Sequence, residues 1–215
     1  MSTGARLTTT SYAILGLLAV QPWSTYELTR QMEWSYGRFW PRARSKLYEE
    51  PKKLEALGLA SSTPGRVGRR ARKVYSITPA GRQALARWHG EPTGGISLEA
   101  EPLLRVFLAD QGAKTDVVAT LDAARAWAVE RNEGNLRAGR AFVSGGARFQ
   151  ARAAQTMLVG AFLTDFYKLV ADWAEWARTQ VEEWPEDTSQ ARPDAVEQAA
   201  VLARAEWSEA PARPR

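Results

Sequence analysis

The sequence predicts a mainly α-helical protein: an N-terminal winged helix-turn-helix domain with a two-stranded β wing, followed by an α-helical C-terminal dimerisation domain. Apolar residues recur at helical spacing along most of the 215 residues, and two short alternating segments flank a basic loop near residue 70. Charge is also uneven, since residues 1–92 carry a net +9 and residues 93–215 a net −4, which together give the +5 of the whole chain. Positive charge gathered in one domain is typical of proteins that bind a polyanion such as nucleic acid.

The composition excludes several classes of protein. A chain with 45% hydrophobic and 25% charged residues is an ordinary globular one. It has no cysteine and one histidine, His89, so it lacks material for disulfides, thiolate metal sites and histidine-based catalysis. We therefore expect no enzyme activity, no metal and no cofactor. The N-terminus has no apolar signal region and no apolar run reaches the ~20 residues of a membrane span, which predicts a cytoplasmic protein without a membrane partner.

The first two helices are predicted from their caps and their apolar spacing. A threonine at one of positions 8–10 can cap a helix whose apolar residues continue to Val20. Ser24 or Thr25 can then cap a second helix that is expected to end near residues 35–37. With the basic segment that follows, three helices in this order give the helix-turn-helix plan.

The segment 40–60 is predicted to be the helix that recognises DNA. Leu47, Leu54 and Leu57 form an apolar face that can dock on the domain. A helix with exposed cations suits the major groove, where arginine and lysine bind guanine. An ordinary amphipathic surface helix is the alternative. Pro51 requires either a kink, which we favour, or two abutting short helices. The predicted contacts of this segment are Arg42, Arg44, Ser45, Lys46, Tyr48 and Lys52.

A basic hairpin is predicted next, after Gly58 ends the helix in a left-handed conformation. Residues 59–63 and 72–78 are expected to be strands, joined by the loop PGRVGRRA. A basic hairpin that follows a recognition helix indicates a wing, whereas the alternative is a solvated charged loop. Thr78 with Pro79 predicts the start of a fourth helix. The cations expected to contact DNA here are Arg66, Arg69, Arg70, Arg72 and Lys73.

The second half is predicted to be helical throughout. We expect a first domain over residues 1–90, a linker over 91–97, a helical domain over 98–207 and a tail over 208–215. The expected helices start near Pro102, span about 115–135, span 151–184 and start after Asp194, with glycines 139, 145 and 146 interrupting between the second and the third.

The predicted helix 151–184 carries an apolar stripe along one side. A helix of 34 residues extends about 50 Å. Such a length exceeds what a small domain can cover, so a second copy of the chain is expected to bury the stripe. The alternative is that the aromatic residues line a site for a flat, apolar effector. The residues of this stripe are Leu158, Phe162, Phe166, Leu169, Trp173 and Trp176.

The order of elements from Leu15 to Trp88, with the strings YEL, RSKLYEEPKKLEALGLA and KVYSITPAGRQAL, resembles the winged helix of the PadR family of transcriptional regulators. The resemblance covers roughly the first 90 residues. It departs from the family at Thr25, where glycine is frequent, and at Pro51, which many members lack. It implies a dimeric DNA-binding repressor whose C-terminal helices form the dimer and help to sense a small molecule.

We therefore expect a homodimeric repressor that binds an inverted-repeat operator in double-stranded DNA and is released by a small hydrophobic or aromatic effector. Thr25 and Tyr26, at the start of the second helix, join the cations as predicted DNA contacts. A winged-helix module that binds another protein, with no specific DNA site or ligand, is the alternative. Weak and salt-insensitive binding to any duplex would favour that alternative.

Overall fold

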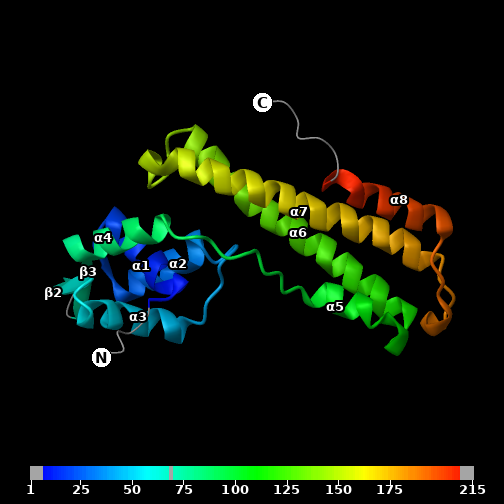
Figure 1. Ribbon diagram of the computed structural model, residues 1–215, viewed down its shortest axis with the longest axis horizontal. Helices are drawn as coiled ribbons and strands as arrows, with labels where there is room; N and C mark the ends of the chain where they lie inside the picture. Colours follow the sequence, from blue (N-terminus) through cyan, green and yellow to red (C-terminus); the bar gives the residue numbers. More distant parts are fainter. Residues whose placement is uncertain (1–6, 68–69, 209–215) are drawn as a thin grey trace. The chain divides into compact units, whose positions relative to one another are not determined.

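The structure is a computed structural model that describes residues 7–67 and 70–208, the side chains of Arg44, Arg66, Val67, Arg70 and Ala71 excepted. The chain divides into two compact units, residues 1–96 and 97–215 (Figure 1). The first unit is a helical domain with a small antiparallel sheet. The second consists of helices throughout its described part. The predicted fold class, a winged helix-turn-helix followed by a helical domain, is confirmed.

The first two helices begin at the predicted caps. Helix α1 (Thr9–Val20) is capped by Thr8, whose hydroxyl accepts a hydrogen bond from the Ser11 amide while the Ser11 hydroxyl accepts one from the Thr8 amide. Helix α2 (Thr25–Ser35) is capped in the same reciprocal way by Ser24 and Glu27. Such capping boxes satisfy backbone donors that have no partner inside the helix.

Helix α3 (Arg44–Ala56) passes through Pro51 as one continuous helix, so the alternative of two abutting helices is wrong. Pro51 is fully buried, and its packing offsets the hydrogen bond that a proline removes from a helix. The predicted apolar face is correct for Leu47 and Leu54 but wrong for Leu57, which follows the last helical residue and is 39% exposed.

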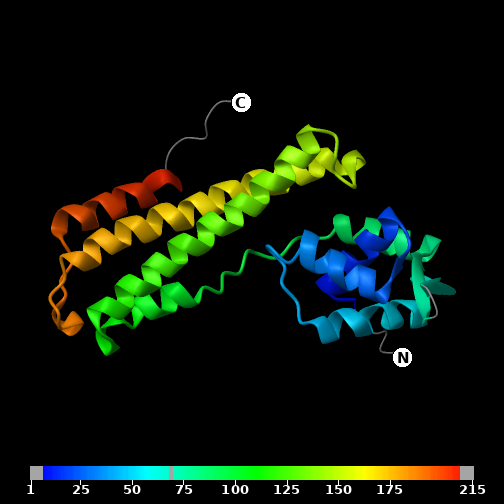
Figure 2. The same ribbon diagram turned by 180° about the vertical axis from the view of Figure 1, so that it is seen from behind.

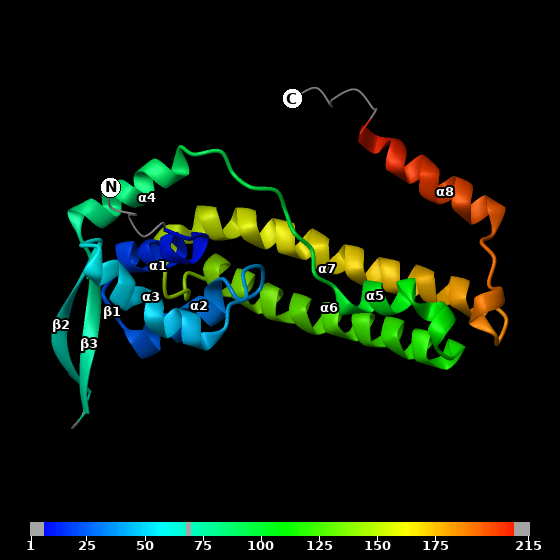
Figure 3. The ribbon, with the colours of Figure 1, turned by 60° about the horizontal axis from the view of Figure 1, so that its bottom comes forward.

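The sheet has three strands in the order β1-β3-β2, whereas two were predicted. Strand β2 (Ala60–Val67) pairs with β3 (Arg70–Ile77) over their whole length, and the two form the wing hairpin (Figure 3). Both strands therefore extend into the segment predicted as a loop. The missed strand, β1 (Trp23–Ser24), pairs with Tyr75 and Val74 of β3 and is too short to leave an alternating pattern.

Helix α4 (Pro79–His89) is the last helix of the first unit and packs against α1. Thr78 caps it by accepting a hydrogen bond from the Gly81 amide, as predicted, and His89 is its last residue. Trp88 stacks on Tyr12 of α1 with the ring centroids 4.8 Å apart. Gly81 has to be glycine here, because a Cβ on it would lie 2.1 Å from the backbone oxygen of Leu59.

The second unit is built on two long helices of equal length, α6 (Lys114–Val143) and α7 (Ala153–Glu182) (Figure 2). They pack antiparallel. Asp122 near the start of α6 pairs with Arg178 near the end of α7, whereas Asn135, farther along α6, donates hydrogen bonds to Gly160 and Thr164 in the first half of α7. The prediction that glycine interrupts the chain at position 139 is wrong, because α6 continues through it. An exposed helix tolerates one glycine at a cost of about 1 kcal/mol.

Shorter helices complete the second unit. They are α5 (Glu101–Phe107), η1 (Ala109–Gln111), η2 (Gln150–Arg152), η3 (Thr188–Gln190), α8 (Ala195–Ala205) and η4 (Glu206–Ser208). Asp194 caps α8 as predicted, by accepting hydrogen bonds from two amides of its first turn. Trp176 of α7 donates a hydrogen bond to Glu197 of α8 at 3.0 Å, which fastens the two helices together.

The face of α7 that packs on α6 differs from the predicted apolar stripe. The buried residues of α7 are Leu163, Tyr167, Ala174, Ala177 and Val181. In the predicted stripe, Leu158, Phe162 and Leu169 are exposed by 54–69%, while Phe166, Trp173 and Trp176 are partly buried. Helix α7 therefore has two apolar sides, and α6 covers the one that was not predicted.

Candidate nucleic-acid interface and effector surface

Helix α3 presents a polar face to solvent on the side opposite its core contacts. Leu47, Pro51 and Leu54 are buried on the inner side. At 100° per residue, the positions opposite them hold exposed polar side chains. The exposed face of α3, as we call it from here on, consists of Ser45, Lys46, Tyr48, Glu49 and Lys52.

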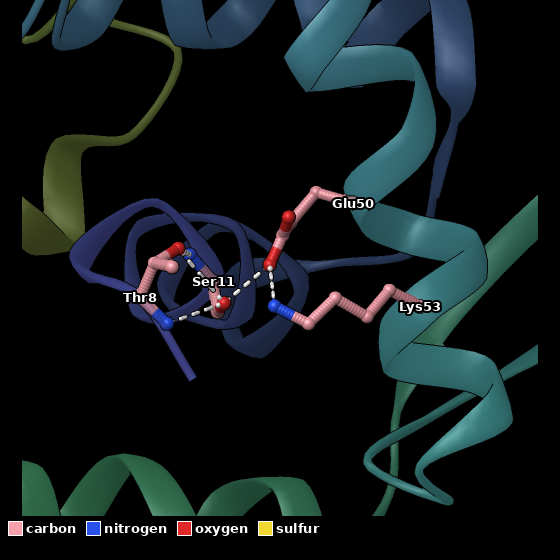
Figure 4. A network of polar contacts seen from close by, with 4 residues as sticks. All are labelled: Thr8, Ser11, Glu50 and Lys53. Atoms are coloured by element: carbon pink, nitrogen blue, oxygen red, sulfur yellow. Dashed lines mark hydrogen bonds and ion pairs between the residues drawn. The ribbon is translucent and has the colours of Figure 1, made fainter. Parts of the chain in front are cut away.

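A polar network sets the rotation of α3 about its own axis (Figure 4). The Glu50 carboxylate points inward and accepts a hydrogen bond from Ser11 of α1, which is completely buried. Lys53 lies 3.3 Å from the same carboxylate oxygen. The Glu50 side chain is only 13% exposed, so the contact with Ser11 joins the basic helix to the capping box of α1. The sequence alone does not indicate this network, because nothing local relates Ser11 to Glu50.

The start of α2 lies beside the wing. Tyr26 is 59% exposed, and the guanidinium of Arg30 lies 5.9 Å from its ring centroid. Thr25 is half-buried. Burial, followed by the charge of Glu55, raises the pKa of Tyr75 in β3. Of the two predicted contacts here, Tyr26 is the more exposed and Thr25 is partly covered within the domain.

Arg72 of the wing points toward α2. Its guanidinium lies 3.2 Å from a Glu27 carboxylate oxygen and donates to the Ser24 hydroxyl at 3.2 Å. The hydrogen bonds from Ser24, and then the charge of Arg72, hold the pKa of Glu27 below its usual value. The prediction grouped Arg72 with the solvent-facing wing cations, but its charge is already paired with Glu27 in the first turn of α2.

The rest of the wing has one described cation on its surface. Lys73 is exposed and lies 3.3 Å from Glu55 of α3, whose pKa is lowered by a hydrogen bond from Ser62 and by Lys73. Arg69 lies outside the described residues, and so do the side chains of Arg44, Arg66 and Arg70. These four predicted contacts stay predictions.

Arg42 precedes α3 and is not part of it, so its expected place on the helix is wrong. Its guanidinium lies 4.0 Å from the ring centroid of Trp40 and donates a hydrogen bond to the Pro41 carbonyl. This turn borders a cavity of about 210 Å³ between α2 and α3. Helix α3 begins at Arg44, after the extended residue Ala43.

The second unit holds the predicted effector and dimer residues. Trp173 and Trp176 pack against a buried cluster that includes Ala109, Val117 and Val181. Two of these cluster residues, Ala109 and Val117, also line a cavity of about 310 Å³ between α5 and α6. Exposed apolar side chains are numerous elsewhere on this unit: Leu104, Phe107, Met157, Leu158, Phe162, Leu169, Leu202 and Trp207.

The described residues contain neither a membrane-spanning helix nor a cluster of metal ligands. No helix there is both long enough and apolar enough to cross a membrane. No group of three or more histidine, aspartate or glutamate side chains there is arranged to hold a metal ion.

Comparison with known proteins gives a match in the first unit. Residues 14–87 match the model of the transcriptional regulator PadR-like family. The probable transcriptional regulator Rv1176c of Mycobacterium tuberculosis is 38% identical over 82 residues, which cover 38% of this chain and 43% of the relative. The negative transcriptional regulator PadR of Bacillus subtilis is 36% identical over 78 residues, which cover 36% of this chain and 43% of the relative. The matched segment thus spans less than half the length of these curated relatives.

Solved structures are similar over both units. Bacillus subtilis PadR in complex with operator DNA has a TM-score of 0.69 and 20% identity, covering 81% of this chain and 99% of the other. The same protein in complex with p-coumaric acid has a TM-score of 0.63 and 21% identity, covering 83% and 99%. At this level of identity the similarity establishes the fold.

Proposed function

Because residues 14–87 match the model of the PadR-like family of transcriptional regulators, we propose that the chain is a repressor that binds operator DNA as a homodimer. The related PadR from Bacillus subtilis is named a negative regulator and has been solved with operator DNA. A regulator of transcription acts where the DNA is, so we place the protein in the cytoplasm. We expect no enzymatic activity.

The exposed face of α3 carries this proposal. Lys46 and Lys52 are exposed, and neither forms an ion pair with any residue that the structure describes. Ser45 and Tyr48 stand between them as hydrogen-bonding groups. A helix with this surface fits the major groove, where its cations release counterions from the phosphates and its polar groups contact base edges. Lys73 extends the basic surface on the wing, where contacts to phosphates or to the minor groove are expected.

We propose that a second copy of the chain covers the outer side of α7. Phe162 and Leu169 are exposed by 54% and 65% on a helix of 30 residues, and a single domain gains nothing from apolar groups left in water. Two-fold pairing there would give two recognition helices. These would bind half-sites of an inverted repeat about 34 Å apart, or a multiple of that distance.

We further propose that a small hydrophobic or aromatic effector binds the second unit near Trp173 or Trp176 and weakens DNA binding. The cavity between α5 and α6 shares Val117 with the cluster on which both tryptophans pack, and its volume of about 310 Å³ suits one aromatic ring with a short substituent. The related Bacillus subtilis protein has been solved with p-coumaric acid. Such an effector must prefer a dimer geometry that does not fit the operator, since equal affinity for both states shifts nothing.

Binding to DNA is tested by selecting sequences from randomised duplexes with the full chain and then footprinting the promoter beside its own gene. We expect an inverted repeat, bound more weakly as salt rises. Arg44→Ala should weaken operator binding by about 1–3 kcal/mol and relax one base position. Arg70→Ala should weaken all sequences alike. No enriched sequence, with weak and salt-insensitive binding to every duplex, would refute the proposal.

Dimerisation is tested by sedimentation of Phe162→Asp and Leu169→Asp variants. Both should become monomeric at micromolar concentration and lose most operator affinity, whereas Asp165→Lys, an exposed change on the same helix, should leave the dimer intact. A monomeric wild-type protein that binds DNA would refute this part.

The effector is tested by measuring operator affinity with and without p-coumaric acid and related aromatic acids. A coupling of about 1–3 kcal/mol would weaken binding by ~5- to 150-fold. Trp173→Leu should abolish the response while the variant still dimerises. This variant is more informative than Trp176→Leu, because Trp176 also holds α8 through Glu197. An unchanged response in both variants would move the site away from these tryptophans.

A further inference from the structure

Glu49 is a carboxylate at the centre of the exposed face of α3. It stands four residues after Ser45 and three before Lys52, on the side of the helix opposite the buried Leu54. Among the residues that the structure describes, none forms a hydrogen bond or an ion pair with its side chain. A negative charge is thus presented on the surface that the proposed function assigns to DNA.

The absence of an ion pair follows from the neighbouring network (Figure 4). Lys53 occupies the i+4 position, the spacing at which a lysine best pairs with a preceding glutamate. Its ammonium group instead lies 3.3 Å from Glu50, whose carboxylate also accepts the hydrogen bond from buried Ser11. The two adjacent glutamates therefore differ in direction: Glu50 anchors the helix to the core, and Glu49 points outward without a neutralising partner among the side chains that the structure describes.

A carboxylate in the major groove is compatible with few partners. It is repelled by phosphates and by acceptor groups, which guanine presents as N7 and O6 and thymine as O4. Cytosine presents the N4 amino group, a donor, and glutamate is suited to accept from it. The nearby Lys46 and Lys52 can bind phosphates or guanine and offset the cost of bringing a negative charge to DNA.

We propose that Glu49 determines specificity by accepting a hydrogen bond from the N4 amino group of a cytosine in each half-site. This inference rests on the proposed function. It adds a residue that favours cytosine by attraction and disfavours guanine and thymine by repulsion, whereas adenine presents an amino donor beside the N7 acceptor and is intermediate. The predicted contacts on this segment were cations and hydroxyl groups, and the acidic Glu49 was not among them.

The test compares the full-length wild type with Glu49→Gln and Glu49→Ala, using selection from randomised duplexes. Glu91→Gln is the matched control, since it makes the same change of charge at an exposed position outside α3. The wild type and the control should enrich a cytosine at one position of each half-site. Glu49→Ala should lose that preference, and Glu49→Gln should replace it with adenine, which a glutamine side chain binds through N6 and N7.

Affinities give a second, independent outcome. Operator binding by Glu49→Ala should weaken by about 5- to 100-fold. Binding to a scrambled duplex should strengthen by roughly two- to fivefold, because a negative charge has been removed. Weaker binding to the operator together with stronger binding to the scrambled duplex distinguishes recognition of a base from simple repulsion between Glu49 and DNA.

The inference is overturned if the Glu49 variants enrich the same sequence as the wild type, or if operator and scrambled duplex are both bound more tightly by the same factor. If the wild type itself enriches no sequence, the proposed function fails and the inference fails with it.

Discussion

The contact between Ser11 and Glu50 should contribute measurably to the stability of the first unit. Ser11 is completely buried and the Glu50 side chain is 13% exposed. Removing one partner of a buried hydrogen bond leaves the other unsatisfied, at a cost of about 1–3 kcal/mol. For a unit of this size, 1 kcal/mol shifts Tm by about 4–8 °C. We therefore expect Ser11→Ala and Glu50→Ala each to lower the Tm of the first unit by roughly 4–20 °C.

Differential scanning calorimetry of the full chain measures this effect while the transition of the second unit serves as an internal reference. The double variant Ser11→Ala/Glu50→Ala should lose less than the two single losses combined, with a coupling energy of about 1–2 kcal/mol. Lys53→Ala is the matched control on the same helix. The Lys53 side chain is 32% exposed, so the loss of stability in this variant should stay below about 1 kcal/mol. Single variants within 1 °C of wild type, or strictly additive losses, would refute the role given to this contact.

Three further predictions concern pH, packing and charge. Because the folded pKa of Glu27 is lowered, its contribution to the stability of the first unit is complete above its ordinary pKa of 4.5 and is lost as pH falls through the folded value; Glu27→Gln should flatten this dependence in calorimetry from pH 3 to 7. Gly81→Ala should cost about 1–3 kcal/mol in urea unfolding, because its Cβ would meet a backbone oxygen, whereas Gly94→Ala, with nothing within 4 Å, should change little. Lys52→Ala should weaken binding to operator and scrambled DNA and reduce the salt slope by about one unit; an unchanged slope would show that Lys52 does not contact phosphate.

The features that the sequence predicted correctly depend on short-range interactions. Thr8, Ser24 and Thr78 cap their helices because a hydroxyl needs only the amides two or three residues further on. Gly58 adopts a φ of 70° because the end of a helix favours a left-handed residue there. The order of helices and wing strands followed from such signals, with ends that differ by several residues in the wing.

The direction of charged side chains could not be predicted in this way. Arg72 pairs with Glu27 across 45 positions of sequence, and Glu50 meets Ser11 across 39. Whether a cation faces solvent or an internal carboxylate depends on which elements the fold brings together. Composition could therefore indicate that the first unit is basic without showing which cations are available to a polyanion.

Which apolar side of α7 is buried depends on the tertiary structure. Its sequence offers two apolar sides, one with Phe162 and Leu169 and another with Leu163 and Tyr167. Helical spacing identifies both but does not show which of them a neighbouring helix covers. The sequence by itself determined that this helix is apolar on more than one side, and packing against α6 decided that Leu163 and Tyr167 are buried while Phe162 and Leu169 remain exposed.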